Sequence, residues 1–265
     1  MESDKKQATR TLDVGEVKAF WDSQAANTGI APEAVTHRDH QQRLLEIGIA
    51  GSYLRPGDRL LDVGCGNGYA TALFARKVAS VLAVDYSAGM VERARREHAA
   101  QANIRWEVQD ATSLKVEAGQ FDVAMTLRCL INLGSWPAQQ EAILQVRDAL
   151  RVGGLFLMGE GSVQGRAGLN KAREACGLPV MPSVAHNIDF DENDLWPFVK
   201  LHFDVVEVRR FGLYDLVSRV IHPLLVQPEE PRYDAKINEV GRVLAERLEG
   251  FGELGREFIA VLRRK

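Results

Sequence analysis

From Asp58 to about Leu157, short apolar runs alternate with amphipathic segments, and this alternation constrains the fold more than any other feature. Five of the runs predict strands: RLLDV, SVLAVD, IRWEV, FDVAMT and LFLMG. The segments between them predict helices, with Ser87 and Ser135 placed to cap two of these. Strands that alternate with helices form parallel sheets through right-handed crossovers. The pattern therefore predicts a doubly wound α/β sheet with helices on both faces and ligands at the carboxyl ends of its strands.

The flanking segments predict further elements of the same domain. Upstream, residues 13–26 and 39–54 have the composition of two helices. Downstream, FDVVEVRRF (203–211) and EFIAVLRR (257–264) predict two more strands, with a helix near 236–248 between them. We interpret residues 1–265 as a single domain.

Within this domain we distinguish an N-terminal helical cap (1–55), a ligand-binding core (56–159) and two insertions (160–202 and 212–253). Long insertions in a compact domain are usually functional lids or disordered loops. These two contain enough apolar and aromatic residues to be ordered, so we expect them to form lids over the ligand site.

Charge and cysteine content narrow the partners and the compartment. The formal net charge of -3 gives no electrostatic reason to expect nucleic acid or an anionic membrane as a partner. The three cysteines show no CxxC spacing that would indicate a metal site or a redox pair. The first ten residues lack the apolar core of a signal peptide, and no apolar run reaches the roughly 20 residues that cross a bilayer. We expect a cytoplasmic protein that binds no metal, nucleic acid or membrane.

The glycine-rich stretch LLDVGCGNGY (60–69) follows the first predicted strand and indicates a nucleotide-binding turn. Gly64 and Gly66 fit the dinucleotide fingerprint G-x-G-x-x-G, but Tyr69 occupies its third position, and the extra glycine, Gly68, comes one residue early. Asp62 would also place a negative charge beside a pyrophosphate, which is unfavourable. A P-loop is excluded because no Gly-Lys-Ser/Thr follows. The ligand expected at this turn is therefore not strongly anionic.

Three carboxylates favour a cationic ligand that contains adenosine. Asp62 can attract a cationic amino group, and Asp85, at the end of the second predicted strand, can accept hydrogen bonds from ribose hydroxyls. Asp110 follows the third strand and can accept from the exocyclic amine of a base. These side chains lie at the carboxyl ends of three successive strands, so they fit one ligand.

The motifs LLDVGCGNGY, AVDYSAGM, VQDA and FDVAMTLRCLINL resemble, in order, those of class I S-adenosylmethionine-dependent methyltransferases. The resemblance covers about Arg59 to Met158 strongly and the terminal strands in outline. It implies a mainly parallel seven-stranded sheet whose last strand is antiparallel. It also implies that the protein is an enzyme with S-adenosyl-L-methionine as cofactor and S-adenosyl-L-homocysteine as the product of that cofactor.

Carried over by position, the resemblance implies roles for individual residues. The three glycines would contact the methionyl part of the cofactor, Asp85 the ribose, and Tyr86 and Met90 the adenine face. Asp62 would act on the ammonium group, and Arg43, on the helix before the first strand, is the candidate for the cofactor carboxylate. The predicted cofactor-binding residues are Arg43, Asp62, Gly64, Cys65, Gly66, Asn67, Gly68, Asp85, Tyr86, Met90, Asp110, Ala111 and Arg128.

The segment TLRCLINL (126–133), after the fourth strand, faces the methyl group in this family. It lacks the Asn/Asp-Pro-Pro-Tyr/Phe pattern associated with methylation of nucleobase or glutamine amide nitrogens, which favours a small-molecule acceptor. Arg128 and Asn132 are its best-placed polar groups, with a salt bridge as the structural alternative for Arg128. His186, in the first insertion, has a suitable unperturbed pKa for a general base, with a structural hydrogen bond as its alternative. The predicted catalytic residues are His186, Arg128 and Asn132.

The sequence therefore predicts methyl transfer to a small or medium-sized acceptor, with O-methylation of a sugar, acid or natural product preferred. N-methylation of a small amine is the nearest alternative, because Glu160, Asp189 and Tyr214 could line a pocket for a cation. Two alternatives belong to other classes: an NAD-dependent oxidoreductase, which Tyr69 and Asp62 disfavour, and a non-catalytic cofactor-binding scaffold.

Overall fold

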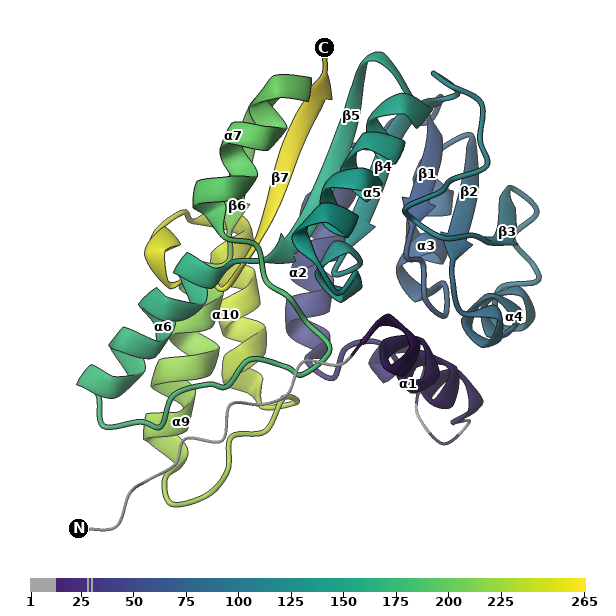
Figure 1. The fold of residues 1–265 in the computed structure, drawn as a ribbon. Coiled ribbons are helices and arrows are strands. Elements are labelled where there is room, and N and C mark those ends of the chain that lie inside the picture. The colour runs from purple at the N-terminus through teal and green to yellow at the C-terminus, as the bar shows by residue number, and fades with distance from the viewer. Residues whose placement is uncertain (1–12, 28, 30) are drawn as a thin grey trace.

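The structure is a computed structural model that describes residues 13–27, 29 and 31–265. Seven strands form one sheet in the order β3-β2-β1-β4-β5-β7-β6, and only β7 is antiparallel to its neighbours (Figure 1). This confirms the predicted sheet. The strands are β1 (Arg59–Val63), β2 (Ser80–Asp85), β3 (Ile104–Val108), β4 (Phe121–Leu127), β5 (Leu150–Gly161), β6 (Phe203–Arg210) and β7 (Glu257–Arg264). The order reverses between β1 and β4, where doubly wound sheets bind ligands.

Six of the ten described α-helices begin at a residue whose side chain caps them, namely α1, α2, α4, α5, α6 and α7. The hydroxyls of Ser87 and Ser135 accept hydrogen bonds from the backbone N–H of Met90 (3.1 Å) and Ala138 (3.3 Å), as predicted. The α-helices are α1 (Val14–Ala26), α2 (His40–Gly51), α3 (Tyr69–Phe74), α4 (Ala88–Glu97), α5 (Trp136–Ala149), α6 (Val163–Ala175), α7 (Glu192–His202), α8 (Gly212–Asp215), α9 (His222–Val226) and α10 (Lys236–Arg247). A π-helix, η4 (Leu216–Ile221), joins α8 to α9, and the short 3-10 helices are η1 (Pro32–Ala34), η2 (Ala75–Lys77), η3 (Leu130–Asn132) and η5 (Gly252–Leu254).

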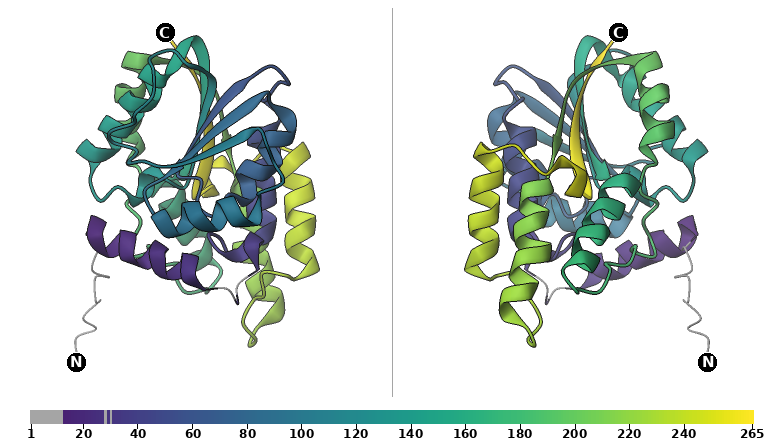
Figure 2. Two further views of the ribbon diagram at one scale, coloured as in Figure 1. Left: turned by 90° about the vertical axis from the view of Figure 1, so that its right-hand side faces the viewer. Right: turned by 90° about the vertical axis from the view of Figure 1, so that its left-hand side faces the viewer.

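Both faces of the sheet are covered, with α2 and α10 on one side and α5 and α7 on the other (Figure 2). Successive residues of a strand point to opposite faces, so Leu60 joins the apolar cluster of α2, and Leu61 joins that of α5. Whereas the edge strands β3 and β6 contain charged residues, the inner strands are almost continuously apolar, because each of their faces is buried. This explains why their positions were predicted well.

Strand β5 is longer than the sequence predicts. The prediction places only residues 155–159 in this strand, whereas it runs from Leu150 to Gly161 and pairs with β7 as far as Glu257. Gly153 and Gly154, expected after the preceding helix, lie within the strand beside a register irregularity. The extension carries Glu160 to the edge where the strands end.

The helix α1 and parts of the two insertions, including α6 and α9, lie beyond the carboxyl ends of the strands. Figure 1 shows α1 below β1 and β2, and α6, α9 and α10 side by side at the other end of the edge. Residues 1–12 of the predicted N-terminal cap are outside the described residues. That the insertions act as lids stays a prediction. Across residues 13–27, 29 and 31–265, no helix is long and apolar enough to cross a membrane.

Candidate functional site

The glycine turn has positive φ values, which residues other than glycine rarely adopt. Gly64, Gly66 and Gly68 have φ values of 78°, 54° and 76°. A Cβ on Gly64 would lie 2.4 Å from Sγ of Cys129, and one on Gly66 would lie 2.8 Å from Cγ2 of Thr36. The segment after β4 and the segment before α2 therefore both meet the turn.

Asp85 fastens the turn to the end of β2. Its carboxylate oxygens accept hydrogen bonds from the backbone N–H groups of Gly66 and Ser87, both at 2.9 Å. Burial raises the pKa of Asp85 to about 6, although both hydrogen bonds lower it. Each carboxylate oxygen can accept more than one hydrogen bond, so Asp85 keeps the capacity to bind the hydroxyls of a ribose.

Asp62 and Arg43 place opposite charges beside the turn. The hydroxyl of Thr71 donates to Asp62 at 2.6 Å, and burial raises the pKa of Asp62 to about 6, partly opposed by Arg43. The guanidinium of Arg43 lies 4.6 Å from the ring centroid of Tyr69 and donates to the carbonyl of Glu33 at 2.7 Å. A carboxylate and a guanidinium in this arrangement suit the ammonium and carboxylate of an amino acid.

Four more predicted cofactor residues lie near the ends of β2 and β3. Met90 is buried against Trp21 of α1, and Ala111 is buried in the core. Asp110 is exposed and accepts a hydrogen bond from the backbone N–H of Thr112 at 2.8 Å. The buried hydroxyl of Tyr86 has no hydrogen-bond partner among the described residues. Buried polar atoms usually have a partner, so Tyr86 has hydrogen-bonding capacity available to a ligand.

The two remaining residues of the turn hold neighbouring segments. Nδ2 of Asn67 donates to the carbonyl of Pro32 at 2.8 Å, which ties residues 31–39 to the turn. Its Oδ1 is buried without a partner in the described part of the chain. Cys65 is buried, and burial raises the pKa of its thiol. Together these contacts make residues 31–39 a cover over the glycines.

Arg128 lies just beyond β4 with a φ of 56°, an uncommon value for a residue with a side chain. Its backbone N–H donates to the carbonyl of Gly159 at 2.7 Å. Its guanidinium forms an ion pair with Glu46 of α2; burial raises the pKa of Glu46, and the charge of Arg128 lowers it. The salt bridge considered as the alternative for Arg128 is therefore present, and its predicted catalytic role stays a prediction.

Asn132 and His186 meet through helix α1. Oδ1 of Asn132 accepts from the indole N–H of Trp21 at 2.8 Å, and its Nδ2 donates to Asn187 at 3.4 Å. The ring of His186 stacks on that of Phe20, with centroids 4.7 Å apart, and burial lowers its pKa. The structure thus gathers two of the predicted catalytic residues under α1, while Arg128 points to α2.

The side chains that kept N-methylation open all have protein partners. Glu160 is buried and accepts from the backbone N–H groups of residues 129–131, at 3.0 to 3.3 Å, and burial raises its pKa to about 7. Asp189 forms an ion pair with α6, and the hydroxyl of Tyr214 donates to Asp39 at 2.7 Å. They therefore hold the protein together in this structure.

His37 was missed by the sequence reasoning. Its Nδ1 lies 2.8 Å from the carbonyl oxygen of Asp39, so Nδ1 carries the proton, and Nε2 has no hydrogen-bond partner within the described residues. Burial lowers the pKa of His37 well below its ordinary value, and Arg128 lowers it further. The available signal was the polar run THRDH (36–40) before the second helix.

Comparisons with known proteins agree with this arrangement. Residues 60–154 match a family model described as a methyltransferase domain. The chain is 33% identical over 146 residues to 27-O-demethylrifamycin SV methyltransferase of Amycolatopsis mediterranei, which covers 53% of this chain and 49% of the relative. It is 36% identical over 120 residues to demethylmenaquinone methyltransferase of Symbiobacterium thermophilum, covering 43% and 47%. The matches thus span about half the length of these relatives.

Solved structures share the fold over nearly the whole chain. An N-methyltransferase, NodS from Bradyrhizobium japonicum in complex with S-adenosyl-L-homocysteine, has a TM-score of 0.56 at 14% identity, covering 94% of this chain and 98% of the other. The [4+2]-cyclase SpnF has a TM-score of 0.58 at 19% identity, covering 98% and 99%. Because a protein named as a cyclase shares this fold, the fold alone does not determine the reaction.

Proposed function

Because this chain belongs to the class I S-adenosylmethionine-dependent methyltransferases, we propose that it transfers a methyl group from this cofactor to an oxygen of a small acceptor. The observation that carries the proposal is the convergence of Asp62, Arg43 and Asp85 on one glycine turn. These groups match an amino acid joined to a ribose.

In this proposal each end of the cofactor has its own protein groups. Asp62 and Arg43 bind the amino-acid part, Asp85 binds the ribose, and Tyr86 and Met90 lie against the adenine. When bound, the cofactor supplies a methyl group on a positively charged sulfur. The protein's main tasks are then to align an acceptor lone pair and to exclude water.

A candidate base near the turn supports oxygen as the methyl acceptor. A hydroxyl acceptor benefits from a base, and neutral His37 presents Nε2 without a partner among the described residues. Thr36, next to His37 in the sequence, lies close to Gly66 of the turn. Cys129, next to Arg128 in the sequence, lies close to Gly64. We therefore propose that His37 takes the hydroxyl proton at Nε2. We also propose that the insertions 160–202 and 212–253 cover the acceptor.

Cofactor identity is tested first, by thermal-shift titration of the whole chain with S-adenosyl-L-homocysteine and with NADH. We expect stabilisation by S-adenosyl-L-homocysteine alone, because of the charge beside the turn. Stabilisation by NADH alone would instead support an oxidoreductase. The reaction is tested next, by measuring S-adenosyl-L-homocysteine formation with matched hydroxyl, carboxyl and amine acceptors. Preference for amines would contradict O-methylation, and cofactor binding without turnover would support a scaffold or a cyclase-like protein.

The two histidines separate two versions of the mechanism. We expect His37→Gln to lower kcat by about 100-fold or more, the usual range for loss of a general base, without changing S-adenosyl-L-homocysteine affinity. We expect His186→Ala to leave cofactor binding intact and to slow transfer less, because its ring packs on Phe20. Unchanged turnover in His186→Ala would remove His186 from the catalytic residues, and unchanged turnover in His37→Gln would remove His37.

A further inference from the structure

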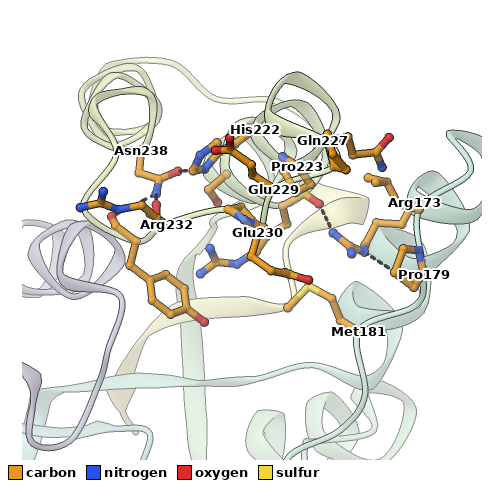
Figure 3. Close-up of a pocket in the computed structure, with 16 residues that line it drawn as sticks. Arg173, Pro179, Met181, His222, Pro223, Gln227, Glu229, Glu230, Arg232 and Asn238 are labelled. Atoms are coloured by element: carbon orange, nitrogen blue, oxygen red, sulfur yellow. Dashed lines mark hydrogen bonds between the residues drawn. The ribbon is translucent and has the colours of Figure 1, made fainter.

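A cavity of about 670 Å³ lies between the two insertions, away from the glycine turn (Figure 3). In Figure 3, Arg173 and Pro179 lie on one wall, and Asn238 and Arg232 lie on the other. Much of the lining is apolar, from Leu178, Pro179, Met181, Pro223, Pro228 and Pro231. The volume is within the range of small-molecule sites.

Hydrogen bonds fix both walls. On the α6 side, Asn170 donates to the carbonyl of Met181 at 3.1 Å and accepts from its N–H at 2.8 Å. On the α10 side, Asn238 donates to the carbonyls of Arg232 and Tyr233, both at 3.0 Å. The cavity is therefore bounded by ordered segments of the chain.

Arg173 is a buried cation without a counterion among the residues that the structure describes. It is 8% exposed, and its guanidinium donates to two backbone carbonyls, those of Pro179 (2.8 Å) and Arg219. None of the described residues forms an ion pair with Arg173. Burial lowers its pKa, and the nearby guanidinium of Arg219 lowers it further. A buried charge is costly unless it is paired, so this arrangement is suited to an anion from outside the chain.

The acidic residues of the cavity do not supply that anion. Glu229 and Glu230 line it, but both are exposed on the loop that follows α9. Arg232 is exposed too and is paired with Asp234. The inner wall is therefore cationic, and the two carboxylates belong to the rim.

The inner wall is also linked by contacts to the segment that carries the proposed base. Arg219 lines the cavity and forms an ion pair with Asp39, and its guanidinium lies 5.3 Å from the ring centroid of Tyr233. The carbonyl of Asp39 accepts from His37, and the adjoining Thr36 meets the glycine turn. The buried pair of Arg219 and Asp39 therefore lies between the cavity and the proposed base.

We propose that this cavity binds the methyl acceptor, and that Arg173 binds a carboxylate or phosphate on it. The cavity then holds the apolar, anionic end of the acceptor, and the acceptor must be long enough to extend past the Arg219–Asp39 pair and bring its hydroxyl to the glycine turn. Carboxylate and phosphate share the planar, charge-assisted recognition that a guanidinium gives. This inference rests on the proposed methyl transfer.

The test measures binding of three probes to the whole chain saturated with S-adenosyl-L-homocysteine, by isothermal titration: benzoate, phenyl phosphate and benzamide. Benzoate and benzamide have nearly the same shape and differ in charge. We expect at least one of the two anions to bind about tenfold or more tightly than benzamide, since a charge-assisted hydrogen bond contributes about this much. The anion that binds more tightly identifies the group, carboxylate or phosphate.

Variants then assign the effect to Arg173. We expect Arg173→Gln to abolish the preference for anions, and Lys171→Gln, an exposed change of the same charge on the same helix, to preserve it. Met181→Glu, which adds a carboxylate to the lining of the cavity, is expected to weaken binding of both anions about tenfold. Each variant must bind S-adenosyl-L-homocysteine as the original chain does, which shows that it is folded.

Equal binding of the three probes, no binding of either anion, or an unchanged preference in Arg173→Gln would overturn the inference. If S-adenosyl-L-homocysteine binds normally in those cases, methyl transfer remains supported and only the anion site is lost. If the chain does not bind S-adenosyl-L-homocysteine at all, the proposed function fails, and with it the role of the cavity as an acceptor site.

Discussion

Two regions at the carboxyl edge of the sheet, the glycine turn and the side of the insertions, are held together by different interactions. At the glycine turn, the backbone N–H of Gly66 binds the carboxylate of Asp85, 19 residues away in the sequence. On the side of the insertions, Asp39 binds Tyr214 and Arg219, which are 175 and 180 residues away. The first end is local and uses the backbone, whereas the second consists of buried charges from distant segments.

This difference determines how each end responds to change. The positive φ values of the turn are set by its own glycines. A substitution of a ligand-binding side chain there should therefore affect binding more than folding, even at Asp85, which also binds two backbone N–H groups. A buried ion pair has already lost its hydration, so removing one partner leaves an uncompensated charge and destabilises the protein.

The largest effect is expected for Asp85→Ala at the turn. It removes the proposed ribose acceptor and two hydrogen bonds to the backbone, and we expect S-adenosyl-L-homocysteine affinity to fall by about 1,000-fold or more, roughly 4 kcal/mol. Isothermal titration measures this change. Asp110→Ala, at an exposed carboxylate, should cost about tenfold or less. An Asp85→Ala variant that binds S-adenosyl-L-homocysteine normally would contradict the view that the turn mainly serves binding.

The next effect is expected for Arg219→Gln on the side of the insertions. It leaves Asp39 buried without its guanidinium, and we expect the free energy of unfolding to fall by about 3 kcal/mol or more in urea denaturation. Lys236→Gln breaks an exposed pair with Glu239 and should change stability by about 0.5 kcal/mol or less. Equal effects of the two substitutions would mean that the buried cluster adds no more stability than a surface pair.

A pH titration sharpens the comparison at the turn. Burial raises the pKa of Asp62 and of Asp85 to about 6, so both carboxyls become protonated as the pH falls through 6. Their proposed roles require the ionised form, so S-adenosyl-L-homocysteine affinity should fall by about tenfold or more between pH 6 and pH 5. Asp62→Asn should bind less tightly and show a shallower pH dependence. A flat affinity profile would remove both carboxylates from the proposed site.

The same two carboxyls should affect folding with the opposite sign. Their pKa values in the folded chain exceed the ordinary value of 3.8, so the stability they contribute is lost as the pH rises from about 4 to 6. Urea denaturation of the ligand-free chain across this range measures it, with Asp62→Asn as the comparison.

The smallest effect is expected for Trp21→Phe, where α1 meets the reaction site. The change removes the hydrogen bond from the indole N–H to Asn132, and we expect α1 to open about fivefold more often, or about 1 kcal/mol. Hydrogen exchange of the α1 amides measures this opening. Trp136→Phe, on α5, should leave exchange in α1 unchanged. No change in Trp21→Phe would mean that other contacts hold α1 in place.

The regular elements of the core were predicted closely from the sequence. The predicted bounds of β1, β2, β3 and β7 agree with the structure, because short apolar runs between turn signals leave little choice of register. The extension of β5 was not predicted, since Gly153 and Gly154 indicated a helix end rather than an irregular strand. A pattern read over a few residues cannot include the pairing with β7 that continues the strand to Gly161.

In the candidate site, too, local features were predicted from the sequence and long-range ones were not. The motif residues at the turn could be proposed from the sequence because the spacing of Gly64 and Gly66 and the position of Asp85 are local properties of the chain. His37 was missed because its significance depends on Arg128, which lies far away in the sequence and close in space. Glu160 looked available in the sequence, whereas the structure shows its carboxylate bound by the backbone of η3.

The sequence by itself determined the sheet, the glycine turn and the kind of cofactor, because strand pattern and turn geometry arise from neighbouring residues. Only the tertiary structure decided which charges are paired, which histidine is buried beside Arg128 and where a cavity remains. Those properties depend on the burial of side chains from distant segments, and burial is fixed only when the chain has packed.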